Sequence, residues 1–202
     1  GQITITLTSI DPVGPCLSNS DSFIYTISDE AVVDAMPDAT VCEGELVSLS
    51  ASLQGAASSA TWSDNGAGGQ IINENQSTGF AQYILPSGVN QVVLFVETNV
   101  PSPLCPSDID SVVITILDLP TISSLSDQTV CDGSTTQAVV FNGTGTQYSW
   151  TNNDTIIGLA SSGSGDIAPF TAQNGGQNAV NALITVTPEY TSGGVTCPGS
   201  TE

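Results

Sequence analysis

The pentapeptide Thr40-Val-Cys-Glu-Gly44 returns as Thr129-Val-Cys-Asp-Gly133, and its two cysteines lie 89 residues apart. Two tryptophans keep nearly the same interval, since Trp62 and Trp150 are separated by 88 residues. Self-similarity at a fixed period is the signature of a repeat architecture. We therefore interpret the chain as successive copies of one unit of about 90 residues.

A second cysteine series supports the same period. Cys16, Cys105 and Cys197 are spaced by 89 and 92 residues, and each follows a β-rich run by about ten residues. The period predicts three parts, which are the C-terminal part of a truncated module, a complete module, and a module that lacks its final strand. Their predicted ranges are residues 1–29, 30–118 and 119–202.

Apolar and polar residues alternate along short runs, which is the pattern of half-buried strands. Val112, Ile114 and Ile116 show it in one run, and residues 137–141 in another. Turn clusters rich in Gly, Ser and Asn separate these runs, and no segment keeps a helical period. Short strands in units of about 90 residues predict an all-β fold of tandem immunoglobulin-like sandwiches.

The charge of the chain excludes several functions. The sequence has 20 acidic residues and no Lys, Arg or His, for a net charge of −20. Nucleic-acid binding requires cations that displace counterions from phosphates, and an anionic membrane surface repels such a chain. Catalysis that uses His or Lys is excluded, and the carboxylates are scattered rather than paired, so we expect no enzyme.

Targeting signals are also missing from the sequence. There is no run of 18 apolar residues, so we expect no membrane insertion. Gly1 begins directly in strand-like sequence, without a signal peptide. We interpret the chain as a mature or excised fragment.

Several motifs resemble the PKD-like modules of surface proteins from Bacteroidota. They are Asp127-Gln-Thr-Val-Cys-Asp-Gly133, Tyr148-Ser-Trp-Thr151, the stretch ending at Ile167, Ile184-Thr-Val-Thr-Pro188, Cys197-Pro-Gly-Ser200 and, in the central part, Asp38-Ala-Thr-Val-Cys-Glu-Gly44. The resemblance implies β-sandwich units in large adhesins, gliding-associated filaments or accessory regions of secreted enzymes, exported by the type IX route. It implies no catalytic residues.

Regularly spaced cysteines in a secreted chain predict a disulfide framework. We expect one bond within each module, Cys42 with Cys105 and Cys131 with Cys197. Each bond would stabilise its module by about 3–4 kcal/mol. Cys16 would then be unpaired because its partner is truncated. The alternative joins neighbouring modules through Cys16–Cys42 and Cys105–Cys131, and the sequence leaves it open.

The acidic residues also contain calcium candidates, because hard oxygen ligands suit that ion. They are Asp29, Asp34 and Asp38 in one connector and Asp108 and Asp110 near Cys105. No EF-hand spacing is present, and a solvated acidic surface explains the same residues. No other cofactor is expected.

Two further kinds of site follow from single residues. Trp62 and Trp150 are expected in the sandwich cores, with sugar stacking as the alternative. Ser111 and Thr155 follow Asp and precede an apolar residue, which resembles O-glycan acceptor sites of Bacteroidota.

These observations predict an extracellular or cell-surface protein that acts as a structural or adhesive stalk. Its partners would be neighbouring modules of the same chain and other copies in a filament. A carbohydrate- or protein-binding accessory module of a secreted enzyme is one alternative. A self-assembling fibre subunit, completed by a strand from a neighbour, is another.

Overall fold

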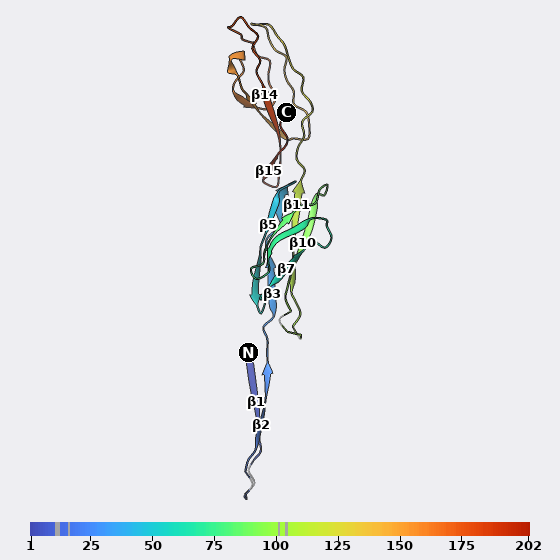
Figure 1. The fold of residues 1–202 in the computed structure, drawn as a ribbon, viewed down its shortest axis with the longest axis vertical. Helices are drawn as coiled ribbons and strands as arrows, with labels where there is room; N and C mark the ends of the chain where they lie inside the picture. The colour runs from blue at the N-terminus through green and yellow to red at the C-terminus, as the bar shows by residue number, and fades with distance from the viewer. Residues whose placement is uncertain (11–12, 16, 101, 104) are drawn as a thin grey trace. The chain divides into compact units, whose positions relative to one another are not determined.

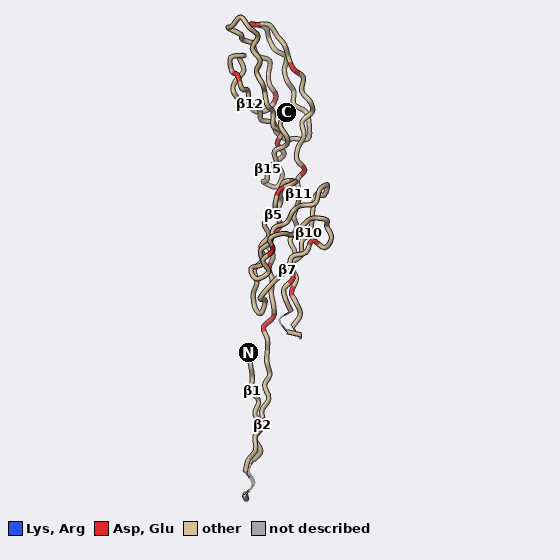
Figure 2. Tube along the Cα trace, in the orientation of Figure 1, with Lys and Arg blue, Asp and Glu red and all other residues tan. Residues whose placement is uncertain are grey.

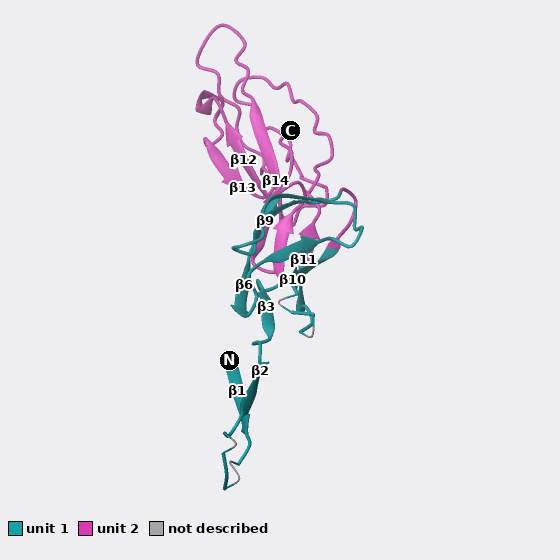
Figure 3. Ribbon diagram, turned by 60° about the horizontal axis from the view of Figure 1, so that its bottom comes forward, with its two compact units in different colours: residues 1–38, 46–86, 92–113 teal, residues 39–45, 87–91, 114–202 magenta. Residues whose placement is uncertain are grey.

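The computed structural model describes all residues except 11–12, 16, 101 and 104, and the fold is all-β, as predicted (Figure 1). The one helical element in the described residues is a 3₁₀ turn, η1 (Thr155–Ile157). Contacts divide the chain into two units, coloured separately in Figure 3. Unit 1 comprises residues 1–38, 46–86 and 92–113, and unit 2 comprises residues 39–45, 87–91 and 114–202.

The chain begins with an antiparallel hairpin of β1 (Gln2–Thr8) and β2 (Ser20–Thr26). Every residue of both strands is exposed, including apolar side chains on both faces of the hairpin, such as Phe23 on one face and Ile24 on the other. The Asp21-Ser22 pair of this hairpin recurs 89 residues later as Asp110-Ser111. In both, the Ser N–H donates to the preceding Asp carboxylate at 2.8 Å.

The central region forms an immunoglobulin-like sandwich. One layer of the sandwich consists of the pair β3-β6 and the sheet β5-β9-β8, where β6 continues β5 after Ser50. The other layer is the sheet β4-β11-β10-β7. This is the division of strands between two sheets that defines the fold. The strands are β3 (Ala31–Ala35), β4 (Ala39–Cys42), β5 (Leu46–Leu49), β6 (Ala51–Gly55), β7 (Ala60–Ser63), β8 (Gln70–Asn75), β9 (Phe80–Ile84), β10 (Gln91–Thr98) and β11 (Ile109–Leu117).

Alternate residues of these strands form the core, as their period of two requires. Leu49, Tyr83 and Leu94 are fully buried in three different strands. Trp62 on β7 is 4% exposed, and its Nε1–H donates to the carbonyl of Gly79, next to β9, at 2.9 Å. That bond joins the two layers of the sandwich across its core, so the prediction of a core tryptophan is confirmed.

A parallel pairing with one constant sequence offset runs along β11. Backbone pairs join Ala39–Cys42 of β4 to Ile114–Leu117 of β11. Before β4, side chains continue the same register, since Val33 N–H donates to Asp108, Ala35 N–H to Asp110, and Val113 N–H to Asp38. Two segments that are distant in sequence are therefore joined along their length, and Cys42 lies beside the last residue of β11.

The last region has the sheet order β13, β12, β14, β15. Trp150 pairs with Val186 of β14, just as Trp62 pairs with Val96 of β10. Trp150 is 8% exposed and packs with Phe141, Leu159, Ile167 and Val186, which confirms it as core. The strands are β12 (Gln147–Asn152), β13 (Ser162–Ser164), β14 (Ile184–Ser192) and β15 (Val195–Pro198).

One predicted strand is reduced to isolated pairing. Residues 137–141 were expected to form a strand, but the structure has a single bridge between Val139 and Ile167. The opposing segment contains Pro169, which has no N–H to donate, and Gln137 N–H turns instead to the side chain of Gln128. The ladder is interrupted because these two donors are lost from it.

A glycine supports the position of Trp150. Gly163 on β13 lies opposite Trp150, and a Cβ atom at Gly163 would stand 2.2 Å from Cζ2 of the indole. We expect Gly163→Ala to lower the free energy of unfolding by roughly 1–3 kcal/mol, because the indole must move. Urea unfolding followed by circular dichroism measures this. Gly175→Ala is the matched control, because nothing lies within 4 Å of its Cβ position. Equal stabilities of the two variants would contradict the contact.

Candidate functional site

The feature that distinguishes this chain is a disulfide between Cys42 and Cys197, whose sequence separation is 155. Cys42 ends β4 and Cys197 lies on β15, and both belong to unit 2. Their Cα atoms are 5.6 Å apart, and the residues are 5% and 0% exposed. The bond therefore joins a cysteine of the Thr-Val-Cys series to a cysteine of the second series.

This pairing corrects the predicted one. We expected Cys42–Cys105 and Cys131–Cys197, with Cys16–Cys42 and Cys105–Cys131 as the alternative. The structure forms neither expected bond. It also contradicts the alternative, because Cys42 bonds Cys197 and both Cys105 and Cys131 are free. Cys42 lies beside Leu117 at the end of β11, whereas Cys105 precedes the start of that strand. A strand of this length spans roughly 30 Å, and a disulfide tolerates Cα atoms no more than about 7 Å apart. Parallel pairing of β4 with β11 thus separates Cys42 from Cys105.

The two other described cysteines are free thiols. Cys105 is partly exposed in the connection from β10 to β11, and Cys131 is exposed. Because Cys42 already binds Cys197, the partner predicted for Cys131 is taken. Cys16, expected to be unpaired by truncation, lies outside the described residues.

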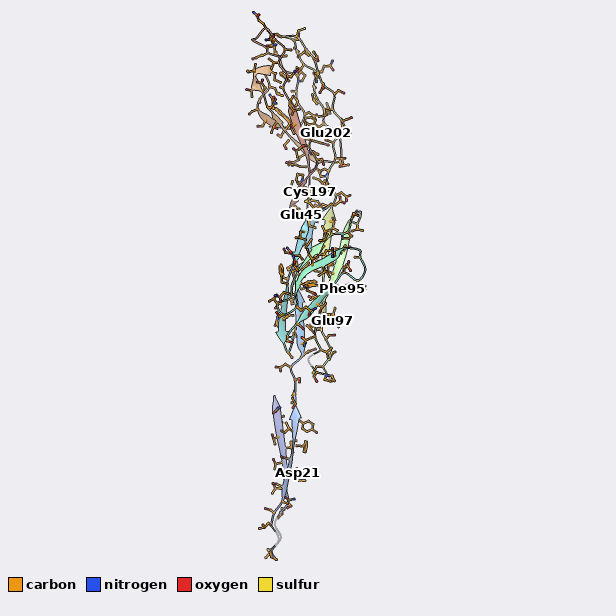
Figure 4. All side chains as sticks on the ribbon, viewed as in Figure 1. Asp21, Glu45, Phe95, Glu97, Cys197 and Glu202 are labelled. Carbon is orange, nitrogen blue, oxygen red and sulfur yellow. A yellow bond between two sulfur atoms is a disulfide. The ribbon has the colours of Figure 1, made fainter. Side chains whose placement is uncertain are left out.

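Local hydrogen bonds hold the Cys42 side of the bond. Residues 40–45, which we call the first cysteine turn, close with Glu45 N–H donating to the Cys42 carbonyl at 3.2 Å. The Glu45 carboxylate accepts Cys42 N–H at 3.1 Å, and Glu43 N–H donates to Leu117. Figure 4 labels Glu45 and Cys197. The backbone on both sides of the Cys42 sulfur is therefore held by the turn itself and by hydrogen bonds to β11.

A short hairpin carries Cys197. β14 and β15 are joined by the two-residue turn Gly193-Gly194, and Cys197 pairs with Tyr190. The Cys42 sulfur lies 3.8 Å from the Thr196 carbonyl, and a Cβ at Gly193 would lie 3.6 Å from Oγ1 of Thr40. The hairpin thus contacts the first cysteine turn beyond the bond itself. The Gly-Gly pair is a hairpin signal in the sequence that the prediction did not use.

Carboxylates accept backbone N–H groups in place of the absent cations, and Figure 2 shows them along the chain. At least ten of the 20 acidic residues do so: Asp21, Asp38, Glu45, Asp64, Glu74, Asp108, Asp110, Asp132, Asp154 and Asp166. Hydrogen bonds to a charged acceptor are stronger than those to a neutral one where they are shielded from water, as for the part-buried bonds of Glu45, Glu74, Asp108, Asp110 and Asp166. The acidic residues therefore help to build the fold.

The calcium candidates are not gathered into a metal site. Asp108 and Asp110 accept backbone N–H groups of β3, and Asp38 accepts one of β11, while Asp29 and Asp34 are exposed. Among the described residues, no group of three or more Cys, Asp or Glu side chains is arranged to hold a metal ion.

Asp64 binds a titratable group whose pKa is clearly shifted. It accepts the Tyr83 hydroxyl at 3.2 Å and N–H groups of Gly66 and Gly69 at 3.0 Å. Burial, together with the negative charge of Asp64 and its hydrogen bond, raises the pKa of Tyr83 from about 10 to about 12. Because the folded pKa lies above the unfolded one, this contribution is complete below pH 10 and is lost as the pH rises through 12.

We expect this to appear as a loss of stability between pH 10 and pH 12. Urea unfolding at a series of alkaline pH values measures it, and an ultraviolet titration reports tyrosine ionisation directly. Tyr83→Phe is the control, because it removes the ionising group and retains the ring. If the variant loses stability over that window as steeply as the native chain, the origin in Tyr83 is wrong.

The O-glycan candidates are both accessible. Ser111 is exposed on β11, and Thr155 is exposed as the first residue of η1. The preceding Asp154 caps η1 by accepting Ile156 N–H at 3.0 Å. Modification of these residues stays a prediction. The buried tryptophans, in contrast, offer no platform for a sugar ring.

No protein-family profile matches this sequence, and no curated protein matches it. Similar solved structures include domains A168–A170 of titin (14% identity, TM-score 0.42, 98% of this chain and 72% of that one) and the insect immune protein hemolin (13%, 0.42, 97% and 54%). The protocadherin gammaB4 extracellular domain is 14% identical with a TM-score of 0.37, and the match covers 98% of this chain and 39% of that one. This chain thus spans about half of hemolin and less of the protocadherin. The fold assignment rests on the strand order above.

A membrane anchor of helical type is not found in the part of the chain that the structure describes, where no helix has the length and apolarity to cross a bilayer.

Proposed function

We propose that this chain is a structural spacer in an extracellular or cell-surface protein, with no catalytic role. The observation that carries the proposal is the Cys42–Cys197 bond. Tension applied at the two ends passes along residues 1–42, crosses the sulfur bridge and leaves through residues 197–202. Everything between the two cysteines is outside that path. Beyond its N-terminal hairpin, a chain built in this way transmits force with little lengthening.

The segment that enters the bridge is already extended. Residues 33–42 run beside β11 in one continuous register, bound through backbone pairs and through Asp38, Asp108 and Asp110. If the bridge is reduced, tension pulls this segment from its start and β11 from its end. Because the two are parallel, their hydrogen bonds are loaded together rather than one after another. The sheet thus resists the same force by a second route.

We propose that residues 1–29, 30–118 and 119–202 are serial modules of the spacer. The sandwich at residues 31–117 is followed by a region that repeats the pairing of its core tryptophan. We propose that these copies belong to a PKD-like stalk or filament of the kind found on Bacteroidota and exported by the type IX route. A disulfide is typical of secreted proteins, and the charge of −20 keeps a long array soluble.

Single-molecule stretching before and after reduction tests the spacer. We expect the oxidised chain to be nearly inextensible beyond its N-terminal segment and the reduced chain to lengthen greatly. Equal lengths in both states would refute the proposed function.

A further inference from the structure

The two cysteine turns differ in exposure, because other segments pack on the first and the second is exposed to solvent. In the first, Cys42 is buried, and Thr40 and Val41 are half-buried. Residues 129–134, the second cysteine turn, are exposed throughout, with Val130 at 42% and Cys131 a free thiol. Two neighbours cover the first turn, namely β11 and the hairpin that carries Cys197.

The two turns have the same backbone structure. Glu45 N–H donates to the Cys42 carbonyl, and Ser134 N–H donates to the Cys131 carbonyl at 3.0 Å. These bonds close the β-turns 42–45 and 131–134, and the third residue of each β-turn is a glycine with positive φ, 81° at Gly44 and 75° at Gly133. These are the features of one β-turn type, which requires glycine at that position. Cys131 is therefore presented as Cys42 is, without the partner.

The other free thiol, Cys105, matches Cys197 in its sequence context and position. Cys105 belongs to the same series as Cys197, is followed like it by proline, and stands after β10 as Cys197 stands after β14. Its N–H donates to the Ser102 carbonyl at 2.9 Å, and its side chain is partly exposed. Cys105 therefore resembles Cys197 before a bond forms.

Sandwich topology places the cysteine turn and the Cys105 loop at opposite ends of β11. The parallel pairing of β4 with β11 places the cysteine turn beside the end of β11, where the chain leaves the sandwich. The loop with Cys105 lies at the start of β11, near the beginning of β3, because Asp108 binds Val33 N–H. The turn therefore lies near the end of β11, where the chain leaves the sandwich, and the loop lies near the start of β11, where the chain enters it.

We propose that Cys131 and Cys105 are the two halves of a head-to-tail joint between copies of this chain, equivalent to the Cys42–Cys197 bond. Cys131 of one molecule bonds Cys105 of the next. Two thiols form one disulfide and release two protons and two electrons, which a disulfide oxidant such as oxidised glutathione accepts as it becomes two thiols. The joint extends the spacer proposal, on which it rests, since it converts a spacer into a covalent array.

The test uses two full-length variants, both with Cys16→Ser. One carries Cys105→Ser and keeps Cys131, and the other carries Cys131→Ser and keeps Cys105 and is ¹⁵N-labelled. They are mixed in a glutathione redox buffer, and dimers are identified by mass spectrometry after digestion at acidic residues without reduction. We expect the mixed dimer, linked through Cys131 and Cys105, to exceed either homodimer by roughly tenfold, because docking raises the effective concentration of one pair of thiols.

A dimer distribution equal to random pairing, or monomers that carry only glutathione, would overturn the joint. Thr129→Glu on the Cys131 molecule should reduce the mixed dimer to the random share, because Thr129 corresponds to Thr40, whose Oγ1 lies where a Cβ at Gly193 of the hairpin turn would meet it. Ser124→Glu, also exposed, is the matched control and should leave the yield unchanged. Failure of the joint is separable from failure of the spacer, because the stretching measurement involves only Cys42 and Cys197.

Discussion

Reduction of the Cys42–Cys197 bond will lengthen the fully stretched chain by roughly 500–550 Å. The bridge removes 155 residue steps from the path between the termini, and each extended residue adds about 3.3–3.6 Å. Without reductant, the extensible path is residues 1–42 and 197–202, much of it strand already. The measurement is single-molecule force spectroscopy on the chain held at its two ends.

The control for this measurement is the double variant Cys42→Ser/Cys197→Ser. It should reach the full length without reductant and show no further gain when reductant is added. The predicted pairing, Cys42–Cys105 with Cys131–Cys197, would instead give two separate gains, each from a loop less than half as long. A native chain that shows two such gains would mean that the bond in solution is not the one described here.

Trp62→Ala will destabilise the central sandwich by roughly 3–5 kcal/mol, a large part of the stability of such a domain. The cause is the loss of a buried indole together with its hydrogen bond to the Gly79 carbonyl. Urea unfolding followed by circular dichroism measures the loss. A variant that keeps native stability would show that the indole lies on the surface and would restore the sugar-stacking alternative.

The second tryptophan offers a matched comparison. Trp62→Phe leaves the Gly79 carbonyl without its donor, which costs about 1–3 kcal/mol beyond the change in size. Among the described residues, Nε1 of Trp150 has no hydrogen-bond partner. Trp150→Phe should therefore cost less than Trp62→Phe. Each variant also retains a single tryptophan, so its fluorescence follows one region of the chain.

The sequence was informative where the signal is local or periodic. The alternation at Val112, Ile114 and Ile116 predicted a strand with one buried face, and all three residues are buried in β11. The tryptophans were correctly placed in cores, because large apolar side chains in half-buried strands point inward. The fold class followed from these patterns.

Disulfide pairing was not predictable from spacing alone, because more than doubling the length of a closed loop changes its closure free energy by less than about 1 kcal/mol. The deciding fact is the direction of β4 relative to β11, which separates Cys42 from Cys105. Directions follow from the sandwich topology, so the predicted fold already contained grounds to reject that pair. The interrupted ladder at residues 137–141 needed knowledge of its opposing segment, which spacing does not supply.

The bond between Cys42 and Cys197 also changes what a protease can do to this chain. Hydrolysis of any one peptide bond from residue 43 to residue 196 leaves both fragments attached through sulfur, so a single nick does not sever the molecule. Trypsin finds no Lys or Arg to cut, and enzymes that cut after Asp or Glu meet carboxylates that are partly engaged by backbone donors. A filament made of such units would stay connected after single proteolytic cuts that sever a chain of domains without this bond.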